Sequence, residues 1–302
     1  TTSARASRIS RQRASSSAAS GGVSNSWKTC AWMVRPSSSK RRGAKISQAS
    51  SAVNDGIGAI SWEFLTQAPR VGMSQGGIFP QILGTIYLMV LVLIISIPIG
   101  ILSAVYLVEY QKNRFMKGVW RVVVHNLAGV PSVVYGLLGL GLFVLLLDMG
   151  ASLIAAGLTL SILVLPIIIA STREALIAIP PSLREASMAL GATKWQTVRH
   201  HILPYAMPGI LTGVILSLSR AAGETAPIIL VGAAFYMPNL PDSLFSAFQA
   251  LPYHIYALAT QTRIALTGPN LFGSALVLLM LVVGMNLVAI MLRNKYRKKY
   301  RW

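Results

Sequence analysis

Acidic residues are scarce in this chain of 302 residues: 8 Asp and Glu stand against 27 Lys and Arg, a formal net charge of +19. Charged residues of both signs make up only 12% of the sequence, about half of the share in soluble domains. The single cysteine, Cys30, excludes an internal disulfide and argues against a metal cluster. The composition therefore excludes an ordinary soluble domain.

Catalytic and metal-binding patterns are also missing. His200 and His201 are adjacent, so they cannot share a face as metal ligands do, and His254 is isolated. No paired carboxylates, activated nucleophile or Walker-type Gly-Lys-Ser/Thr loop is present. We therefore expect no metal, no cofactor and no catalytic residue, and we predict that the protein is not an enzyme.

Long apolar runs are abundant instead. Hydrophobic residues make up 54% of the chain, and the mean hydropathy is +0.60. A membrane-spanning helix needs about 20 mostly apolar residues, and five segments qualify. We predict an all-α membrane protein, a polytopic helical bundle, with spans at about 82–108, 122–147, 150–170, 206–234 and 271–292.

The basic residues collect between and beyond these runs, which is typical of the cytoplasmic face of a membrane protein and argues against nucleic-acid binding. They gather after the first span, in segment 171–205 and in the last ten residues. The positive-inside rule predicts that these three regions, the C-terminus included, are cytoplasmic. Residues 148–150 and 235–270 are then expected outside.

Residues 1–55 differ from the rest. They are rich in Ser, Ala and Arg, and they contain neither an apolar run nor a signal peptide. We predict a polar, basic, disordered segment there, followed by a transmembrane domain over 56–302. Five spans with a cytoplasmic C-terminus would leave these basic residues outside, so the side of the N-terminus stays open.

The 171–205 loop contains signals for two short helices. Pro180 and Pro181 are expected to stop the preceding helix. Ser182 followed by Glu185 predicts a capping box that starts a new helix. Gly191 is a natural terminator for it.

A second capping box follows at once. Thr193 with Gln196 predicts a further helix that runs to Pro204. Two capped helices joined at a glycine make a rigid projection that can insert into a groove on another protein. The alternative is an amphipathic hairpin that lies on the lipid surface.

The same loop resembles the "EAA" loop of ABC importer permeases, whose pattern is Glu-Ala-Ala, three residues, Gly, nine residues, Ile-x-Leu-Pro. Ser187 replaces the third alanine here, and His201 replaces the isoleucine. The resemblance implies the type I importer permease fold, with a sixth span not visible in this sequence. It also implies a loop that docks into cytoplasmic ATPase subunits, through Ser182, Glu185, Ala186, Ser187, Gly191, Ala192, Thr193, Leu203 and Pro204.

Two charges interrupt the fourth predicted span, in "SLSRAAGETAPIILVG" (217–232). A charge inside a membrane span is costly and is usually paired or lines a polar path. Arg220 and Glu224 are four residues apart, so we expect them to share a helix face and to pair, with a break near Pro227. The pair either fixes helix packing or forms an anion path, in which Arg220 binds the anion, Glu224 moderates its grip and Thr225 adds a hydroxyl.

The segment 209–230 is similar to the phosphate-specific, PstA-type branch of these permeases, and so are 76–88, 98–110 and 130–143. The resemblance covers about 57–292. It implies a multi-pass permease subunit in the lipid of a bacterial inner membrane that imports inorganic phosphate by alternating access. The implied partners are a second homologous permease, two ATP-binding subunits and an external phosphate-binding protein.

Two alternatives remain at this point. One is a permease for another oxyanion, such as sulfate or molybdate, or for a small solute. The other is a channel or carrier that works without an ATPase, although the internal repeats common in carriers are not visible here.

Overall fold

The computed structural model describes residues 53–54, 56–70, 73, 75–237, 239–260 and 264–299. Cys30 and nearly all of the segment 1–55, expected to be disordered, lie outside these residues. The chain divides into two units between Asn54 and Asp55, and the second unit contains the helical bundle.

Four helices in the described residues are long and apolar enough to cross a membrane, which confirms a polytopic helical bundle. Three of them match the first, third and fifth predicted spans. They are Phe79–Tyr110, built from α5 (Phe79–Val105) and the π-helical turn η1 (Tyr106–Tyr110), then α8 (Leu153–Ile177), and Asn270–Lys299 within α14 (Ile264–Lys299).

The predicted span over 122–147 is formed by two helical segments and not by one straight helix. The chain forms α6 (Arg114–Ala128), then α7 (Ser132–Gly139) with the π-helical turn η2 (Leu140–Leu146), and the two parts are bent by 97°. Pro131 lacks an amide hydrogen and disfavours helical backbone at the residue before it, so the helix breaks there. The described residues hold a fifth span only if this bent pair is counted as one.

Helix α8 lies at the centre of the bundle. In its most apolar window 61% of the residues are buried, against 6% in α14, whose surface is left for lipid or another subunit. Leu88 of α5, Leu163 of α8 and Leu218 of the next helix, α11 (Leu203–Gly223), meet in the largest core cluster. A side chain at Gly213 of α11 would collide with Ser171 of α8, so this glycine sets the close approach of the two helices.

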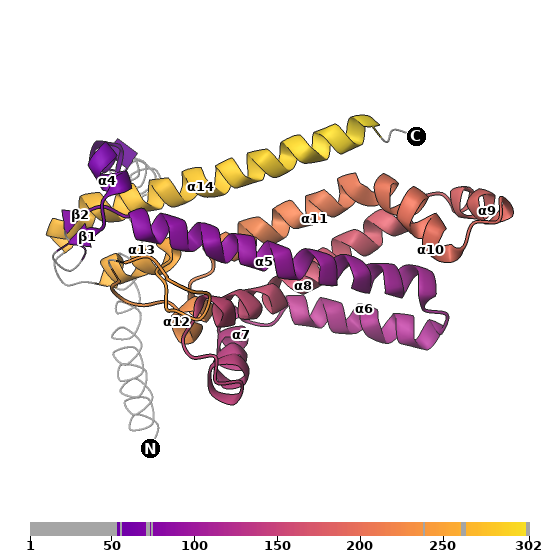
Figure 1. Cartoon of the computed structure of the whole chain (residues 1–302), viewed down its shortest axis with the longest axis horizontal. Coiled ribbons are helices and arrows are strands. Elements are labelled where there is room, and N and C mark those ends of the chain that lie inside the picture. The colour runs from indigo at the N-terminus through magenta and orange to yellow at the C-terminus, as the bar shows by residue number, and fades with distance from the viewer. Residues whose placement is uncertain are drawn as a thin grey trace, which may run out of the picture. The chain divides into compact units, whose positions relative to one another are not determined.

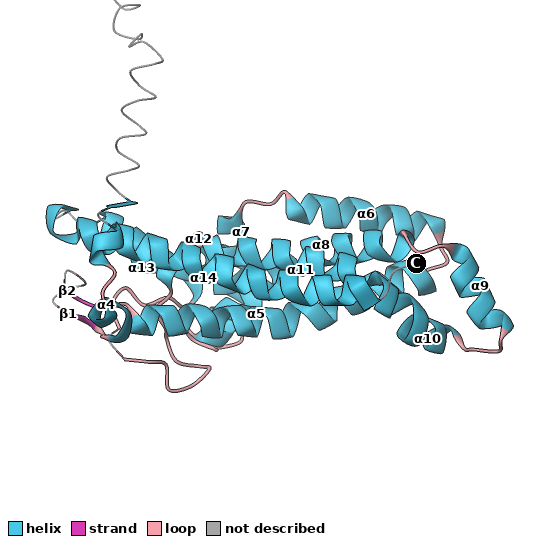
Figure 2. Cartoon of the chain, turned by 90° about the horizontal axis from the view of Figure 1, so that it is seen from above, coloured by secondary structure: helices cyan, strands magenta, loops and turns pink. Residues whose placement is uncertain are grey.

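Short elements lie at the two ends of the bundle (Figures 1 and 2). At one end are α4 (Trp62–Thr66), an antiparallel ribbon of β1 (Pro69–Arg70) and β2 (Gln75–Gly76), and α13 (Leu251–Thr260). At the other end α9 (Pro181–Ala189) and α10 (Lys194–Thr197) project beyond the long helices. We call residues 181–197 the α9–α10 hairpin.

Candidate functional site

The first helix of the hairpin starts two residues earlier than predicted, at Pro181. Pro180 is the N-cap of α9 and Pro181 is in its first turn, and the N-cap makes no side-chain hydrogen bond. The capping box predicted for Ser182 and Glu185 is therefore wrong. A proline at the first helical position already has suitable backbone angles and no amide hydrogen to satisfy, so the helix begins without a capping side chain.

The turn between the two helices follows the prediction. Gly191 has φ +86°, the left-handed conformation in which glycine ends a helix. The capping box of Thr193 and Gln196 is present: Gln196 N donates to Thr193 Oγ1 (3.3 Å), and Thr193 N donates to Gln196 Oε1 (2.8 Å). Each end of the turn is thus fixed by its own local interaction.

Ser187, which departs from the family pattern, has a structural role. Its hydroxyl lies 2.9 Å from the Thr197 hydroxyl, and both side chains are buried. This hydrogen bond connects α9 to α10 across the turn. Glu185 and Ala186 lie on the exposed side of α9 instead.

The prediction that the second helix of the hairpin ends at Pro204 is wrong. The helix continues through α10, the π-helical turn η3 (Val198–Ile202) and α11, and forms one helix, Lys194–Gly223, of 30 residues. Pro204 is in the first turn of α11, directly after the π-helical turn, whose altered hydrogen-bond pattern accommodates a residue without an amide hydrogen. We call Lys194–Gly223 the long rod.

The tip of the hairpin is apolar, which sequence reasoning missed. Leu190 is 89% exposed, and Met188 and Trp195 are 44% and 49% exposed. The signal was present, because all three lie within four residues of Gly191. Large exposed apolar side chains at a projecting tip indicate a contact surface for another protein.

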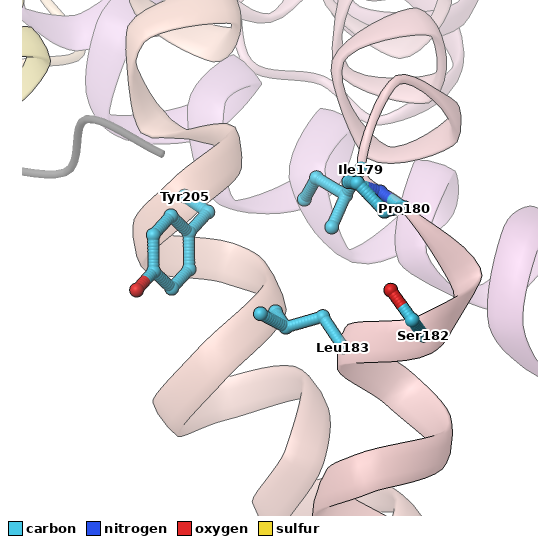
Figure 3. Close-up of a pocket in the computed structure, with 5 residues that line it drawn as sticks. All are labelled: Ile179, Pro180, Ser182, Leu183 and Tyr205. Atoms are coloured by element: carbon cyan, nitrogen blue, oxygen red, sulfur yellow. The ribbon is translucent and has the colours of Figure 1, made fainter.

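The base of the hairpin packs on the start of α11. A small hollow there is lined by Ile179, Pro180, Ser182, Leu183 and Tyr205. Figure 3 shows the Leu183 side chain extending from α9 toward Tyr205 of α11. The hairpin therefore rests on the rod as well as continuing into it.

An ion pair that sequence reasoning missed joins the hairpin to two other helices. Arg184 of α9 donates through Nε to Glu109 Oε1 in η1 at 3.0 Å. Its other nitrogens donate to carbonyl oxygens at the end of α8, those of Ile179 (2.9 Å) and Leu176 (2.7 Å). Its side chain is only 19% exposed and that of Glu109 only 13%.

The predicted pairing of Arg220 with Glu224 is present, with Arg220 Nε 3.5 Å from Glu224 Oε1. The prediction that both residues lie on one helix is wrong. Arg220 is in the last turn of α11, and Glu224 is the C-cap residue, with extended backbone (φ −73°, ψ 129°). The chain leaves the helix after Gly223, and the Glu224 side chain turns back toward the arginine. The pair therefore lies across the end of the long rod.

The fourth predicted span, 206–234, is accordingly two helices. Thr225 is the N-cap of α12 (Ala226–Val231), makes no side-chain cap hydrogen bond, and follows Glu224 in the break. Pro227 lies in the first turn of α12, after the break and not at it. It packs against α7, where a side chain at Gly136 would meet its Cα.

A second polar contact beside Arg220 comes from α14. Asn286 Nδ2 donates to Ser219 Oγ at 2.8 Å, 67 positions away in sequence. The Asn286 Oδ1 atom is buried and has no hydrogen-bond partner among the described residues. The only sequence signal is an asparagine inside an apolar run, which is costly in lipid.

The described residues contain no group of three or more His, Cys, Asp or Glu side chains placed to hold a metal ion. His254 in α13 is buried, and burial lowers its pKa to about 4, so its ring is neutral at pH 7.

The family model described as "Binding-protein-dependent transport system inner membrane component" matches residues 96–301. The phosphate transport system permease protein PstA 1 of Mycobacterium tuberculosis (strain CDC 1551 / Oshkosh) is 38% identical over 218 residues, 72% of this chain and 71% of the relative. The probable ABC transporter permease protein YqgI of Bacillus subtilis (strain 168) is 31% identical over 257 residues, 81% of this chain and 87% of the relative.

The fold is also found among solved structures. A chain of a bacterial ABC transporter involved in the import of the acidic polysaccharide alginate superimposes with a TM-score of 0.59, over 90% of this chain and 97% of that one. The sequence identity is 16%, so this likeness concerns the fold alone.

Proposed function

Since the chain belongs to the family of binding-protein-dependent transport system inner membrane components, we propose that it is the permease subunit of an ATP-driven importer for inorganic phosphate. The protein is a multi-pass membrane transport component. The names of its relatives support phosphate as the substrate. Hydrolysis of ATP belongs to partner subunits in this proposal, and the chain itself moves the ion by alternating access.

One observation carries the coupling part of the proposal: α10, the second helix of the hairpin, and Arg220 belong to the same long rod. At about 1.5 Å per residue, the rod separates Lys194 from Arg220 by about 40 Å, more than the thickness of the hydrocarbon core. A displacement of the hairpin by an ATPase subunit therefore reaches the Arg220–Glu224 pair without crossing a loop.

We assign the exposed hairpin to the docking of two ATP-binding subunits. Its apolar tip suits a hydrophobic groove, and Glu185 and Ala186 lie on the surface beside it. The basic end of α14, with Arg297, Lys298 and Lys299, supports a cytoplasmic location for the C-terminus and the hairpin in this proposal. A second homologous permease, lipid and an external phosphate-binding protein complete the assembly.

We assign the anion path to the break at residues 224–225. The Arg220–Glu224 contact is longer than a strong charge-assisted hydrogen bond, and 34% of the Arg220 side chain is exposed. A phosphate oxygen can take the place of the Glu224 carboxylate on this guanidinium. The carboxylate then pairs with Arg220 again and so releases the anion. The Thr225 hydroxyl adds a donor next to it.

Uptake of radiolabelled phosphate into proteoliposomes that contain the complete complex and internal ATP tests this assignment. We expect Arg220→Ala to lower uptake at least about 10-fold, the loss given by one charge-assisted hydrogen bond. Glu224→Ala should slow release and so lower uptake less. Arg173→Gln, which removes a cation from the end of α8, is the matched control and should leave uptake unchanged.

Uptake at the wild-type rate by Arg220→Ala would contradict the anion path. Competition by sulfate or molybdate as strong as that by phosphate would favour the other oxyanion permeases. Uptake that persists without any ATPase subunit would favour a channel or carrier.

A further inference from the structure

Glu109 is the residue at which both helices of the α9–α10 hairpin are attached to α5. Its carboxylate accepts a hydrogen bond from Arg184 of α9, and its backbone carbonyl accepts one from Lys194 Nζ of α10 at 3.2 Å. The Lys194 ammonium also lies 5.8 Å from the ring centroid of Tyr110, the next residue. The two helices therefore converge on one point from both sides of the Gly191 turn.

Arg184 adds α8 to this junction. Its guanidinium donates to the carbonyl oxygens of Leu176, in the last turn of α8, and of Ile179, just beyond that helix, at the negative end of the α8 dipole. The planar guanidinium uses a different nitrogen for each of the three acceptors, in a fixed fork that the single nitrogen of a lysine does not reproduce. A single side chain thus holds α5, α8 and α9 together.

Two π-helical turns meet at the junction. Glu109 is in η1, where α5 ends, and η3 joins the hairpin to α11. Both turns border one small hollow, whose lining residues are Glu109, Arg184, Met188, Lys194, Thr197, Val198 and Ile202. Turns of this type are rare and occur frequently at functional sites. The hairpin therefore has two connections to the bundle, through η3 to α11 and through Glu109 to α5.

We propose that Glu109 is a positioning residue that makes α5 move together with the hairpin. The proposal rests on the docking of the hairpin to ATPase subunits. A push on the hairpin reaches α11 along the rod. It reaches α5 through the apolar packing of Val105 against this region. Among the described residues, it also reaches α5 through the polar contacts of Arg184 and Lys194 with Glu109. Both helices pack on α8, so moving one without the other leaves the bundle only partly rearranged. Without the Glu109 contact, ATP hydrolysis continues and phosphate movement fails.

The number of phosphate ions taken up per ATP hydrolysed, measured in proteoliposomes that contain the complete complex, tests the proposal. Glu109→Gln preserves the volume, an acceptor oxygen and the backbone carbonyl, and removes only the charge. We expect this ratio to fall about 10-fold, while ATP hydrolysis and co-purification of the ATPase subunits are retained.

A second variant shows whether Glu109 acts through Arg184. Arg184→Gln should lower the phosphate-per-ATP ratio as well. The ratio of the double variant should be no lower than the lower of the two single-variant ratios, because both substitutions disrupt the same contact. Glu174→Gln is the matched control: its carboxylate is exposed at the same end of α8 and has no described side-chain partner, so the ratio should not change.

An unchanged ratio in Glu109→Gln would overturn the proposal. Loss of the ATPase subunits from that variant complex would also overturn it, since Glu109 would then support docking and not coupling. A double variant whose ratio falls by the product of the two single-variant reductions would also overturn the proposal, since the two residues would then act independently. Failure of the phosphate assignment appears in the unsubstituted complex, as absence of ATP-driven phosphate uptake, and so differs from each of these results.

Discussion

Arg184 and Arg220 each pair with a glutamate, but the first pair joins residues 75 positions apart and the second joins residues four apart. Arg184 makes three hydrogen bonds to three separate residues and is mostly buried. Arg220 makes one 3.5 Å contact, the only ion pair it has among the described residues, and is about a third exposed. A guanidinium bonded on all its edges holds helices in place, whereas one with a single long contact has donors available for a ligand.

The comparison separates two uses of the same chemistry. The Glu109 pair lies where the α9–α10 hairpin meets the bundle, so its geometry has to survive every cycle of movement. The Glu224 pair lies at the end of the long rod, so we expect its geometry to change when the rod moves. We therefore expect substitutions at the first pair to affect stability and coupling, and substitutions at the second to affect passage of the anion.

The largest effect is expected from exchanging the charges of the second pair. Arg220→Glu combined with Glu224→Arg preserves an ion pair but moves the cation from the helix into the extended segment. If Arg220 binds the anion, uptake should stay about 10- to 100-fold below wild type, the range for loss of one or two charge-assisted hydrogen bonds. Uptake assays on the purified complex measure this. Recovery to wild-type uptake would show that the pair only fixes packing.

A large effect on stability is expected at the first pair. Arg184→Ala leaves Glu109 and two carbonyl oxygens without their donor, at a cost of about 1.5–3 kcal/mol. Thermal unfolding of the complex in detergent should shift to lower temperature. Arg220→Ala should shift it much less, because the contact it loses is longer and more exposed. Equal shifts would remove the distinction between the two pairs.

A smaller effect is expected from Gly191→Ala, a substitution that leaves both ion pairs intact. Alanine at Gly191 must take a left-handed conformation, which costs about 1–2 kcal/mol, although its surroundings are open. The turn should change direction, and the amount of ATPase subunit that co-purifies should fall by up to about 10-fold. Gly223→Ala, in equally open surroundings at the end of the long rod, is the control. Equal loss of the ATPase in both variants would contradict a role for the turn.

The smallest effect is expected at Ser187. Ser187→Ala restores the alanine of the family pattern and removes the hydrogen bond to Thr197, at about 0.5–1.5 kcal/mol. Hydrogen exchange of the α9–α10 hairpin should become faster. Adding Thr197→Val should recover part of the loss, since no buried hydroxyl is then left unpaired. Unchanged exchange in Ser187→Ala would show that the bond contributes nothing to the hairpin.

Features set by neighbouring residues could be predicted from the sequence. The Gly191 turn, the capping box at Thr193 and three of the spans depend on a few adjacent residues or on one apolar run. The errors arose where two local signals competed. Pro181 started α9 before Ser182 could cap it, and a π-helical turn carried the helix past Pro204.

Contacts between distant residues could not be predicted in the same way. Glu109 and Asn286 find their partners 75 and 67 positions away, and which helices are neighbours is decided only when the whole bundle packs. The bend at Pro131 has a local cause, but its angle of 97° depends on where α7 finds a surface to pack on. The sequence showed which residues carry charge, and the fold decided what they touch.

The end of the long rod at Gly223 has a mechanical consequence. Arg220 turns with the rod, whereas Glu224 belongs to the extended segment that α12 holds against α7. We therefore expect a torque applied at the α9–α10 hairpin to move the two charges past each other. The separation of this ion pair would then report the twist of a helix whose driven end is about 40 Å away.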